Sequence, residues 1–341
     1  MLLNPLKTED NLRPQMNPSL PAAGFAAVCA MIALPAFLLP IFAPLGYSIA
    51  AVFLFAGPHN WAEFRFFVAR MPARWGRLSA YFLTGIGGVV LLGGARVALA
   101  VSSHTGYWSD ELHEFATTLW LAGLAVWVGV LFSIRSFESG CLRLRWALPA
   151  CLVLAALACW YPIHCFFALV YLHPLVAFVF LDRELKMWKP EWRRTYHLFL
   201  CTLPFLLAGL YWSLKSAHPL VAKDRVSFQI IFHAGGGHLD LSAHFLVAAH
   251  AALETLHYGV WLLAMPYLSY RGAPWSLKSV ALARRSVTIK KILCTVFLLG
   301  ALAVLLLWIA FWMDYGITRD VYFAIAIFHI LAEFPFLVRA V

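Results

Sequence analysis

The chain has 341 residues, of which 62% are hydrophobic and 12% are charged, and its mean hydropathy is +0.79. These values exclude an ordinary soluble globular domain and predict a polytopic membrane protein. The chain has 26 Lys and Arg against 16 Asp and Glu. In a membrane protein this excess is typical of cytoplasmic loops, so we expect no nucleic-acid partner. The seven cysteines are scattered and have no C-x-x-C spacing, so no disulfide framework or iron–sulfur cluster is predicted.

Residues 1–20 are polar and interrupted by proline, and they predict a cytoplasmic tail rather than a cleaved signal peptide. Residues 21–341 are expected to form a single integral-membrane helical domain. Runs of the length needed to cross a bilayer predict an all-α bundle of about ten transmembrane helices. The predicted ranges are 21–43, 46–67, 79–101, 114–134, 147–161, 163–181, 196–214, 242–265, 292–312 and 320–338. The range 147–161 is short for a full crossing, and a re-entrant segment is its alternative.

The basic residues predict the orientation of these helices. With the N-terminus inside, 21 of the 26 Lys and Arg fall on the cytoplasmic side. Lys215, Lys223, Arg225 and Arg319 fall outside, and Arg96 lies within a span without a partner that the sequence identifies. Because basic residues concentrate in cytoplasmic loops, both termini are expected in the cytoplasm, and the location expected is a bacterial inner membrane.

The longest loop on the other side, 215–241, contains the sequence IIFHAGGGHLDLS. Its three glycines lack the Lys-Ser/Thr ending of a phosphate-binding loop, so a flexible turn or a re-entrant loop is expected there. His233 lies in this loop, where a solvated histidine needs no functional explanation.

Three predicted membrane helices repeat the spacing His-x-x-x-Glu. The pairs are His59 with Glu63, His250 with Glu254, and His329 with Glu333. Residues four apart share a helix face, so each helix directs an imidazole and a carboxylate into one volume. Ionisable groups in a bilayer are costly and generally face a partner or a cavity. Three such pairs therefore predict a common site rather than separate interhelical contacts.

Two further histidines extend this candidate site. His257 follows Glu254 with the Glu-x-x-His spacing of carboxylate-bridged metal bundles. His173 lies at a similar depth on a fourth helix of the same direction. The predicted metal ligands are His59, Glu63, His173, His250, Glu254, His257, His329 and Glu333. Candidate neighbours of these ligands are Trp61, Arg65, His244 and Tyr258.

Mixed imidazole and carboxylate ligands suit iron, with manganese and zinc as alternatives. Five His and three Glu are more than one metal needs, so two iron ions are expected. We therefore expect a membrane metalloenzyme that oxidises, desaturates or cleaves a lipid-like substrate with O₂. The substrate would be a lipid, isoprenoid or carotenoid that enters from the bilayer, and an electron donor would bind at the cytoplasmic face.

Three other functions stay open at this point. Two histidines on facing helices would also ligate haem b in a redox protein. The His–Glu pairs would also serve as the relay of an ion- or proton-coupled transporter. A non-catalytic subunit of a membrane complex would use the same groups as buried polar contacts.

The stretches AGPHNWAEF and LSAHFLVAAH resemble segments of the Brp/Blh family of polytopic membrane iron oxygenases, which cleave β-carotene to retinal. The resemblance implies that His59, His244 and His250 match the histidine ligands of that family and that the substrate is a long polyene. The chain departs from the family by placing Glu at the fourth position after His59 and His250.

Overall fold

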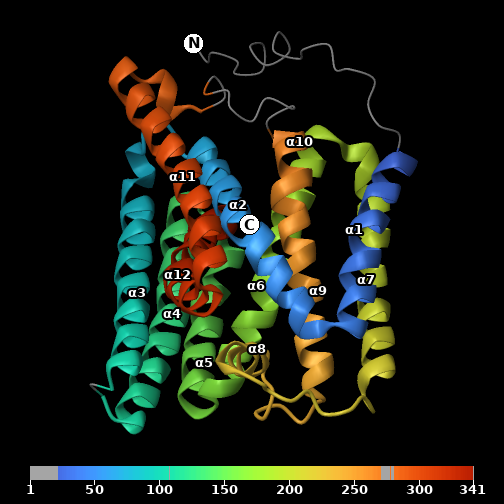
Figure 1. Ribbon diagram of the computed structural model, residues 1–341. Helices are drawn as coiled ribbons and strands as arrows, with labels where there is room; N and C mark the ends of the chain where they lie inside the picture. Colours follow the sequence, from blue (N-terminus) through green and yellow to red (C-terminus); the bar gives the residue numbers. More distant parts are fainter. Residues whose placement is uncertain (1–21, 107, 270–276, 278–279, 341) are drawn as a thin grey trace, which may run out of the picture.

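The computed structural model describes residues 22–106, 108–269, 277 and 280–340. The tail predicted over 1–20 lies outside the described residues. Helices dominate this part of the chain, and no strand occurs in it. The long helices stand side by side as a bundle (Figure 1), so the all-α prediction is confirmed for the described residues.

Each of the ten predicted ranges overlaps a helix. The range 242–265 corresponds to α9, a π-helical segment at Val260–Ala264, and the start of α10. The helices are α1 Ala22–Phe42, α2 Pro44–Arg70, α3 Ser79–Thr105, α4 Asp110–Ser139, α5 Ala147–Trp160, α6 Pro162–Trp188, α7 Arg193–Leu214, α8 Arg225–His233, α9 Ala243–Gly259, α10 Met265–Ser269, α11 Val287–Met313 and α12 Tyr315–Ala340.

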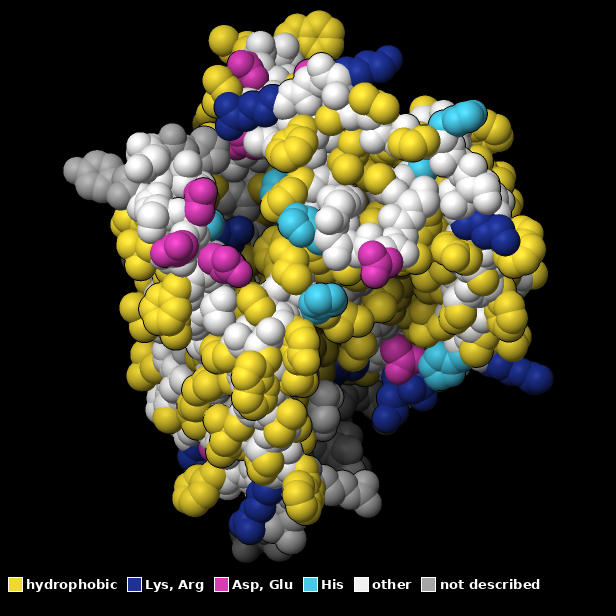
Figure 2. All heavy atoms as spheres, turned by 90° about the horizontal axis from the view of Figure 1, so that it is seen from below, with side chains coloured by type: hydrophobic (Ala, Val, Ile, Leu, Met, Phe, Trp, Pro, Cys, Tyr) yellow, Lys and Arg dark blue, Asp and Glu magenta, His cyan; other side chains and the backbone are white. Residues whose placement is uncertain are grey.

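Seven helices in the described ranges are long and apolar enough to cross a membrane, namely α1, α3, α4, α6, α7, α11 and α12. The surface agrees with a lipid environment, since large hydrophobic side chains such as Leu298, Leu305 and Ile309 on α11 are more than half exposed. Figure 2 views the bundle from below, where charged and histidine side chains lie among hydrophobic ones. Helix α11 buries few side chains of its 27 residues, chiefly Phe297 and Phe311. The chain is therefore an integral membrane protein whose helices expose apolar side chains to lipid.

The loop predicted over 215–241 contains a helix, α8, and the turn predicted at its three glycines follows this helix. Asp224 caps the helix, because its Oδ1 accepts a hydrogen bond from the backbone N–H of Ser227 at 2.7 Å. This hydrogen bond lowers the pKa of the Asp224 carboxyl below its usual range. Gly235 and Gly237 have φ values of +93° and +83° and form the turn that follows.

Four helices that carry the predicted ligands are irregular close to those ligands. Pro58 precedes His59 in α2, Pro174 follows His173 in α6, and Pro335 lies two residues after Glu333 in α12. A proline inside a helix removes one backbone hydrogen bond and bends the helix. In α9 the π-helical segment at Val260–Ala264 begins three residues after His257. Each of these helices therefore departs from regular geometry near the same volume.

Helices α3 and α4 pack closely at Gly88. The indole Nε1 of Trp127 on α4 donates a hydrogen bond to the carbonyl oxygen of Thr84 on α3 at 3.0 Å. A Cβ atom added at Gly88 would lie 1.9 Å from that nitrogen, whereas one added at the neighbouring Gly87 would have no atom within 4 Å. The absence of a side chain at Gly88 thus makes room for the Trp127 ring.

We expect Gly88→Ala to lower the free energy of unfolding by about 1–3 kcal/mol, because the added methyl group forces the indole to move. Gly87→Ala is the matched control, since it makes the same chemical change in the same helix without meeting a neighbour. Thermal unfolding of both purified variants in one detergent measures the difference. Equal unfolding temperatures would contradict the close packing.

Candidate metal centre

Four histidines from four helices form a closed ring. His59 lies on α2, His173 on α6, His257 on α9 and His329 on α12. The ring centroids are 5.3 Å apart for His59 and His257 and 4.8 Å for His257 and His173. They are 5.1 Å apart for His173 and His329, and 5.3 Å for His329 and His59. Residues separated by up to 270 positions thus meet at one point.

Two carboxylates complete this group, because Glu63 and Glu333 each lie one helical turn after a ring histidine. Both are buried, with exposed fractions of 0% and 2%. Two sets of side chains have ligand atoms that all lie within 4.8 Å of one another. The first is His59, Glu63, His257 and His329, and the second is His173, His257 and Glu333. We call these six residues the His/Glu cluster.

Backbone carbonyls fix the protonation of two of the imidazoles. His59 Nδ1 lies 3.0 Å from the carbonyl oxygen of Phe55, and His257 Nδ1 lies 3.3 Å from that of Pro174. A carbonyl oxygen only accepts, so both Nδ1 atoms donate. Each Nε2 is therefore left with the lone pair that binds a metal, as in many metal sites where the second ring nitrogen is held in this way.

His173 and His329 contact each other in the cluster. Their Nε2 atoms are 3.3 Å apart. His173 Nδ1 is 3.0 Å from Oε2 of Glu333, so the same imidazole also contacts a carboxylate.

Several polar atoms of the cluster are buried without a hydrogen-bond partner among the described residues. They are both carboxylate oxygens of Glu63, Oε1 of Glu333, Nε2 of His257 and Nδ1 of His329. Buried polar atoms are nearly always paired in folded proteins, and leaving one unpaired costs about 1–3 kcal/mol. The three carboxylate oxygens are acceptors and Nε2 of His257 carries a lone pair, so one or two bound cations would satisfy these four atoms together. The residues present therefore fit a metal centre.

The structure does not place His250 and Glu254 in the cluster. Nε2 of His250 lies 3.6 Å from Oε1 of Glu254, and seven residues, or about 10 Å of helix rise, separate His250 from His257. The pair lines a cavity next to the cluster instead. The fourth position after His257 is Trp261, which is fully buried, so α9 contributes an imidazole but no carboxylate. Six of the eight predicted ligands are therefore brought together.

The predicted neighbours lie at different distances from the cluster. The ring of Tyr258 is 4.5 Å from that of His59. Trp61 faces α11, where its Nε1 donates to the carbonyl oxygen of Phe297 at 3.1 Å. The Arg65 guanidinium is buried and lies 5.6 Å from the Trp61 ring. His244 is thirteen residues before His257, or about 20 Å along α9, so the resemblance places two histidines, 244 and 250, outside the cluster.

A large apolar groove reaches the cluster from the lipid side. It has a volume of about 850 Å³ and lies between α2, α3, α11 and α12. Most of its wall is aliphatic or aromatic, including Ala303, Leu307 and Phe328. Glu63 and His329 also line it. An apolar molecule in this groove would therefore be in contact with two members of the cluster.

A smaller cavity of about 170 Å³ lies on the inner side of the cluster and is lined by all four ring histidines. Three other residues in its wall, Arg96, His233 and Arg319, are not among the predicted site residues. His233 ends α8 rather than lying solvated in a loop. Burial, followed by the nearby Arg319 guanidinium, lowers its pKa to about 3. The unpartnered arginine in the apolar run LLGGARVALA was the signal for this cavity.

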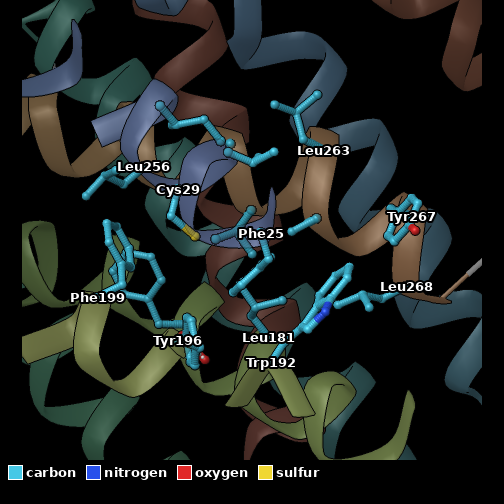
Figure 3. Close-up of a pocket in the computed structure, with 16 residues that line it drawn as sticks. Phe25, Cys29, Leu181, Trp192, Tyr196, Phe199, Leu256, Leu263, Tyr267 and Leu268 are labelled. Carbon is cyan, nitrogen blue, oxygen red and sulfur yellow. Dashed lines mark hydrogen bonds between the residues drawn. The ribbon is translucent and has the colours of Figure 1, made fainter. Parts of the chain in front are cut away.

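Figure 3 shows a third pocket, of about 230 Å³, bounded by α1, α6, α7 and α9. Phe25, Leu181, Trp192 and Phe199 form much of its wall. The Tyr196 hydroxyl, one of its few polar groups, donates to the carbonyl oxygen of Phe178 at 2.7 Å. None of the histidines or glutamates of the cluster lines this pocket, so it is separate from the candidate metal centre.

No protein-family model, curated protein or solved structure matches this chain. The resemblance to the Brp/Blh family stays a prediction, and the residues of the cluster and its cavities are the basis for a function.

We expect His257→Ala to abolish metal binding, because it removes the nitrogen that both ligand sets share. His244→Ala is the control, since it removes an imidazole from the same helix about 20 Å away. Metal content of the purified wild type and both variants, measured by plasma mass spectrometry, tests this. Stoichiometric metal in His257→Ala would contradict the assignment.

Proposed function

We propose that the chain is a membrane-embedded His/Glu metalloenzyme that oxidises, desaturates or cleaves a lipid-like substrate with O₂. The observation that carries this proposal is the contact between the apolar groove and the cluster at Glu63 and His329. A groove of this size and polarity suits a hydrophobic ligand, and a few polar groups at one place in its wall suit chemistry there. The lipid, isoprenoid or carotenoid class fits this groove.

The proposed centre holds two iron ions. His257 offers only Nε2, because Nδ1 is engaged by Pro174, so it serves one ion. That ion would be held by His59, His257, His329 and Glu63, and the second by His173 and Glu333. Imidazole and carboxylate ligands suit iron over softer or purely oxygen-bound metals, and bound iron would supply the electrons that O₂ requires.

The protein would hold the substrate and keep water out. The side chains of the groove are mostly apolar, so Glu63 and His329 would face a bound apolar molecule rather than solvent. Where the groove adjoins the smaller cavity, Asn60 Nδ2 donates to the Tyr322 hydroxyl at 3.1 Å. The Tyr322 hydroxyl lies 3.3 Å from the Ala56 carbonyl oxygen. This pair fixes the wall beside the cluster and would orient the reacting carbon toward it.

The spacing of the histidines supports metal ions over haem b. Axial nitrogens on opposite faces of a haem would lie about 4 Å apart with the macrocycle between them. In the cluster the Nε2 atoms of His173 and His329 are 3.3 Å apart, and buried carboxylates flank the rings. A visible Soret band in the purified protein would reverse this preference.

A proton relay is the second candidate function, and one observation favours it. Glu333, His173 and His329 form a continuous chain of short polar contacts at 3.0 and 3.3 Å. Such a chain would carry protons in an ion-coupled transporter. Stoichiometric metal in the wild type would decide for the enzyme, because a bound metal occupies the lone pairs that the relay needs.

We also propose that α2, α5 and α9 cross the membrane, which gives ten crossings with both termini in the cytoplasm of a bacterial inner membrane. An electron donor would then bind at the cytoplasmic face. The distribution of Lys and Arg supports this orientation.

Single-cysteine variants test the orientation. We expect a membrane-impermeant maleimide to label the exposed Cys141 in inverted vesicles but not from outside. Ser216→Cys, in the loop after α7, should show the opposite pattern. Labelling of both residues from the same side would contradict ten crossings.

The activity itself is tested by lipid analysis. Membranes that contain the iron-loaded wild type should yield, with O₂ and a reductant, products that have gained oxygen or lost hydrogen. We expect Glu63→Ala to abolish these products. Ala303→Trp, which fills the groove, should reduce them about tenfold or more, while Leu302→Trp, at an exposed neighbouring position, should not. Products that are unchanged in Glu63→Ala would contradict the proposal.

A further inference from the structure

The inner cavity carries more positive than negative charge. Arg96 and Arg319 are the arginines in its wall, and Glu254 is its carboxylate. Asp320, next to Arg319 in the chain, pairs with Arg225 at 2.8 Å and offsets only part of this excess. A buried charge without a full counter-charge is expensive and usually marks a partner or a ligand.

Arg319 is held in one orientation. It is 4% exposed, and its Nη1 donates to Oε1 of Gln229 at 3.3 Å. Its Nη2 lies 3.4 Å from Nδ1 of His233, which accepts the hydrogen bond. The guanidinium also covers the ring of Phe323 at 4.7 Å. Its Nε has no hydrogen-bond partner among the described residues, so one donor stays available.

Arg96 approaches the same cavity from α3. It makes no hydrogen bond or ion pair within the part of the chain that the structure describes, although it lines the cavity together with Arg319 and His233. Two guanidinium groups from different helices with unused donors form the arrangement that binds carboxylate or phosphate oxygens.

We propose that Arg96 and Arg319 form a binding site for an oxyanion, a carboxylate or phosphate group at the end of an amphiphilic ligand. Around the arginines the wall is apolar, with Val52, Trp120 and Ile327. This wall suits an amphiphile better than a hydrated inorganic ion.

Helix α12 sets the distance between the proposed oxyanion site and the His/Glu cluster. Arg319 precedes His329 by ten residues on α12, a rise of about 15 Å. Tyr322, Ala326 and His329 line both the inner cavity and the apolar groove, so the two spaces adjoin beside the cluster. If the bound amphiphile is the substrate, which rests on the proposed function, its reacting carbon lies along the chain, well away from the anionic end.

Binding of radiolabelled oleate to the detergent-purified full chain tests the site without turnover. We expect Arg96→Gln to bind oleate about tenfold more weakly or worse, which corresponds to about 1.4 kcal/mol. Arg96→Lys should restore most of the affinity because it keeps the charge. Arg285→Gln is the matched control, since Arg285 is an exposed arginine that does not line the cavity. Its affinity should equal that of the wild type.

Competition in the wild type gives a second measurement that does not depend on the folding of a variant. Unlabelled oleate should displace the label, and methyl oleate, which lacks the negative charge, should not. Displacement by inorganic phosphate at similar concentration would keep the oxyanion site but assign it to a free anion. Equal competition by methyl oleate, or equal binding by Arg96→Gln and the wild type, would overturn the proposal.

The metal-free His257→Ala variant separates this inference from the proposed function. Oleate binding that persists in this variant supports an oxyanion site that is independent of the metal. Oleate binding by a wild type that neither holds metal nor forms lipid products would overturn the enzyme proposal and leave the oxyanion site standing.

Discussion

The placement of six ionisable side chains, four of them buried, inside a lipid-embedded bundle is the constraint on which the rest of the structure depends. Both carboxylates of the cluster are almost completely buried. Both oxygens of Glu63, Oε1 of Glu333 and Nε2 of His257 have no protein partner among the described residues. Polar groups in this state oppose folding unless something neutralises them. A bound metal resolves the problem for all of them at once, and it would link α2, α6, α9 and α12 through one centre. Folding and metal binding should therefore be strongly coupled.

The four helices that meet at the cluster are irregular close to it. Pro58, Pro174 and Pro335 each interrupt a backbone hydrogen bond, and the π-helical turn after His257 shifts the residues that follow. Two of these irregular segments also provide backbone carbonyl oxygens that accept hydrogen bonds from side chains of other helices. The carbonyl of Pro174 orients His257, and that of Pro335 accepts a hydrogen bond from Tyr81. Helix regularity is thus reduced at the place where side-chain direction must be set, which is common at functional sites.

The sequence predicts the helices well because a membrane-spanning helix is a long apolar run, and such runs are visible without tertiary information. It also predicts the pairs His59–Glu63 and His329–Glu333, since residues four apart share a helix face. It does not show which of the three polar groups on α9 lies at the depth of the other helices. His250, Glu254 and His257 all occupy neighbouring turns, and packing against α2 and α6 selects His257.

The sequence does not predict helix α8 or the inner cavity, and the causes differ from the case of α9. The helix is only nine residues long, so few residues carry its hydrophobic periodicity and its signal in the sequence is weak. Arg96, Arg319 and His233 come from three segments far apart in the chain, and no spacing rule relates them. The sequence shows the cost of placing Arg96 in an apolar run, but only the fold shows that the cost is shared with a second arginine across a cavity.

The two cavities that meet at the cluster differ in polarity, and this difference restricts what the centre can do. The apolar groove is open toward lipid, whereas the wall of the inner cavity contains two arginines, a carboxylate and additional histidines. An apolar molecule reaches Glu63 and His329 from one side, while charge and protons are accommodated on the other. A structural polar contact between helices would need neither space. A transport route would need the polar side to continue through the membrane, but α12 residues Tyr322 and Ala326 form the shared wall where the polar space gives way to the apolar groove. The asymmetry therefore favours chemistry on a hydrophobic chain held at the boundary between the two spaces.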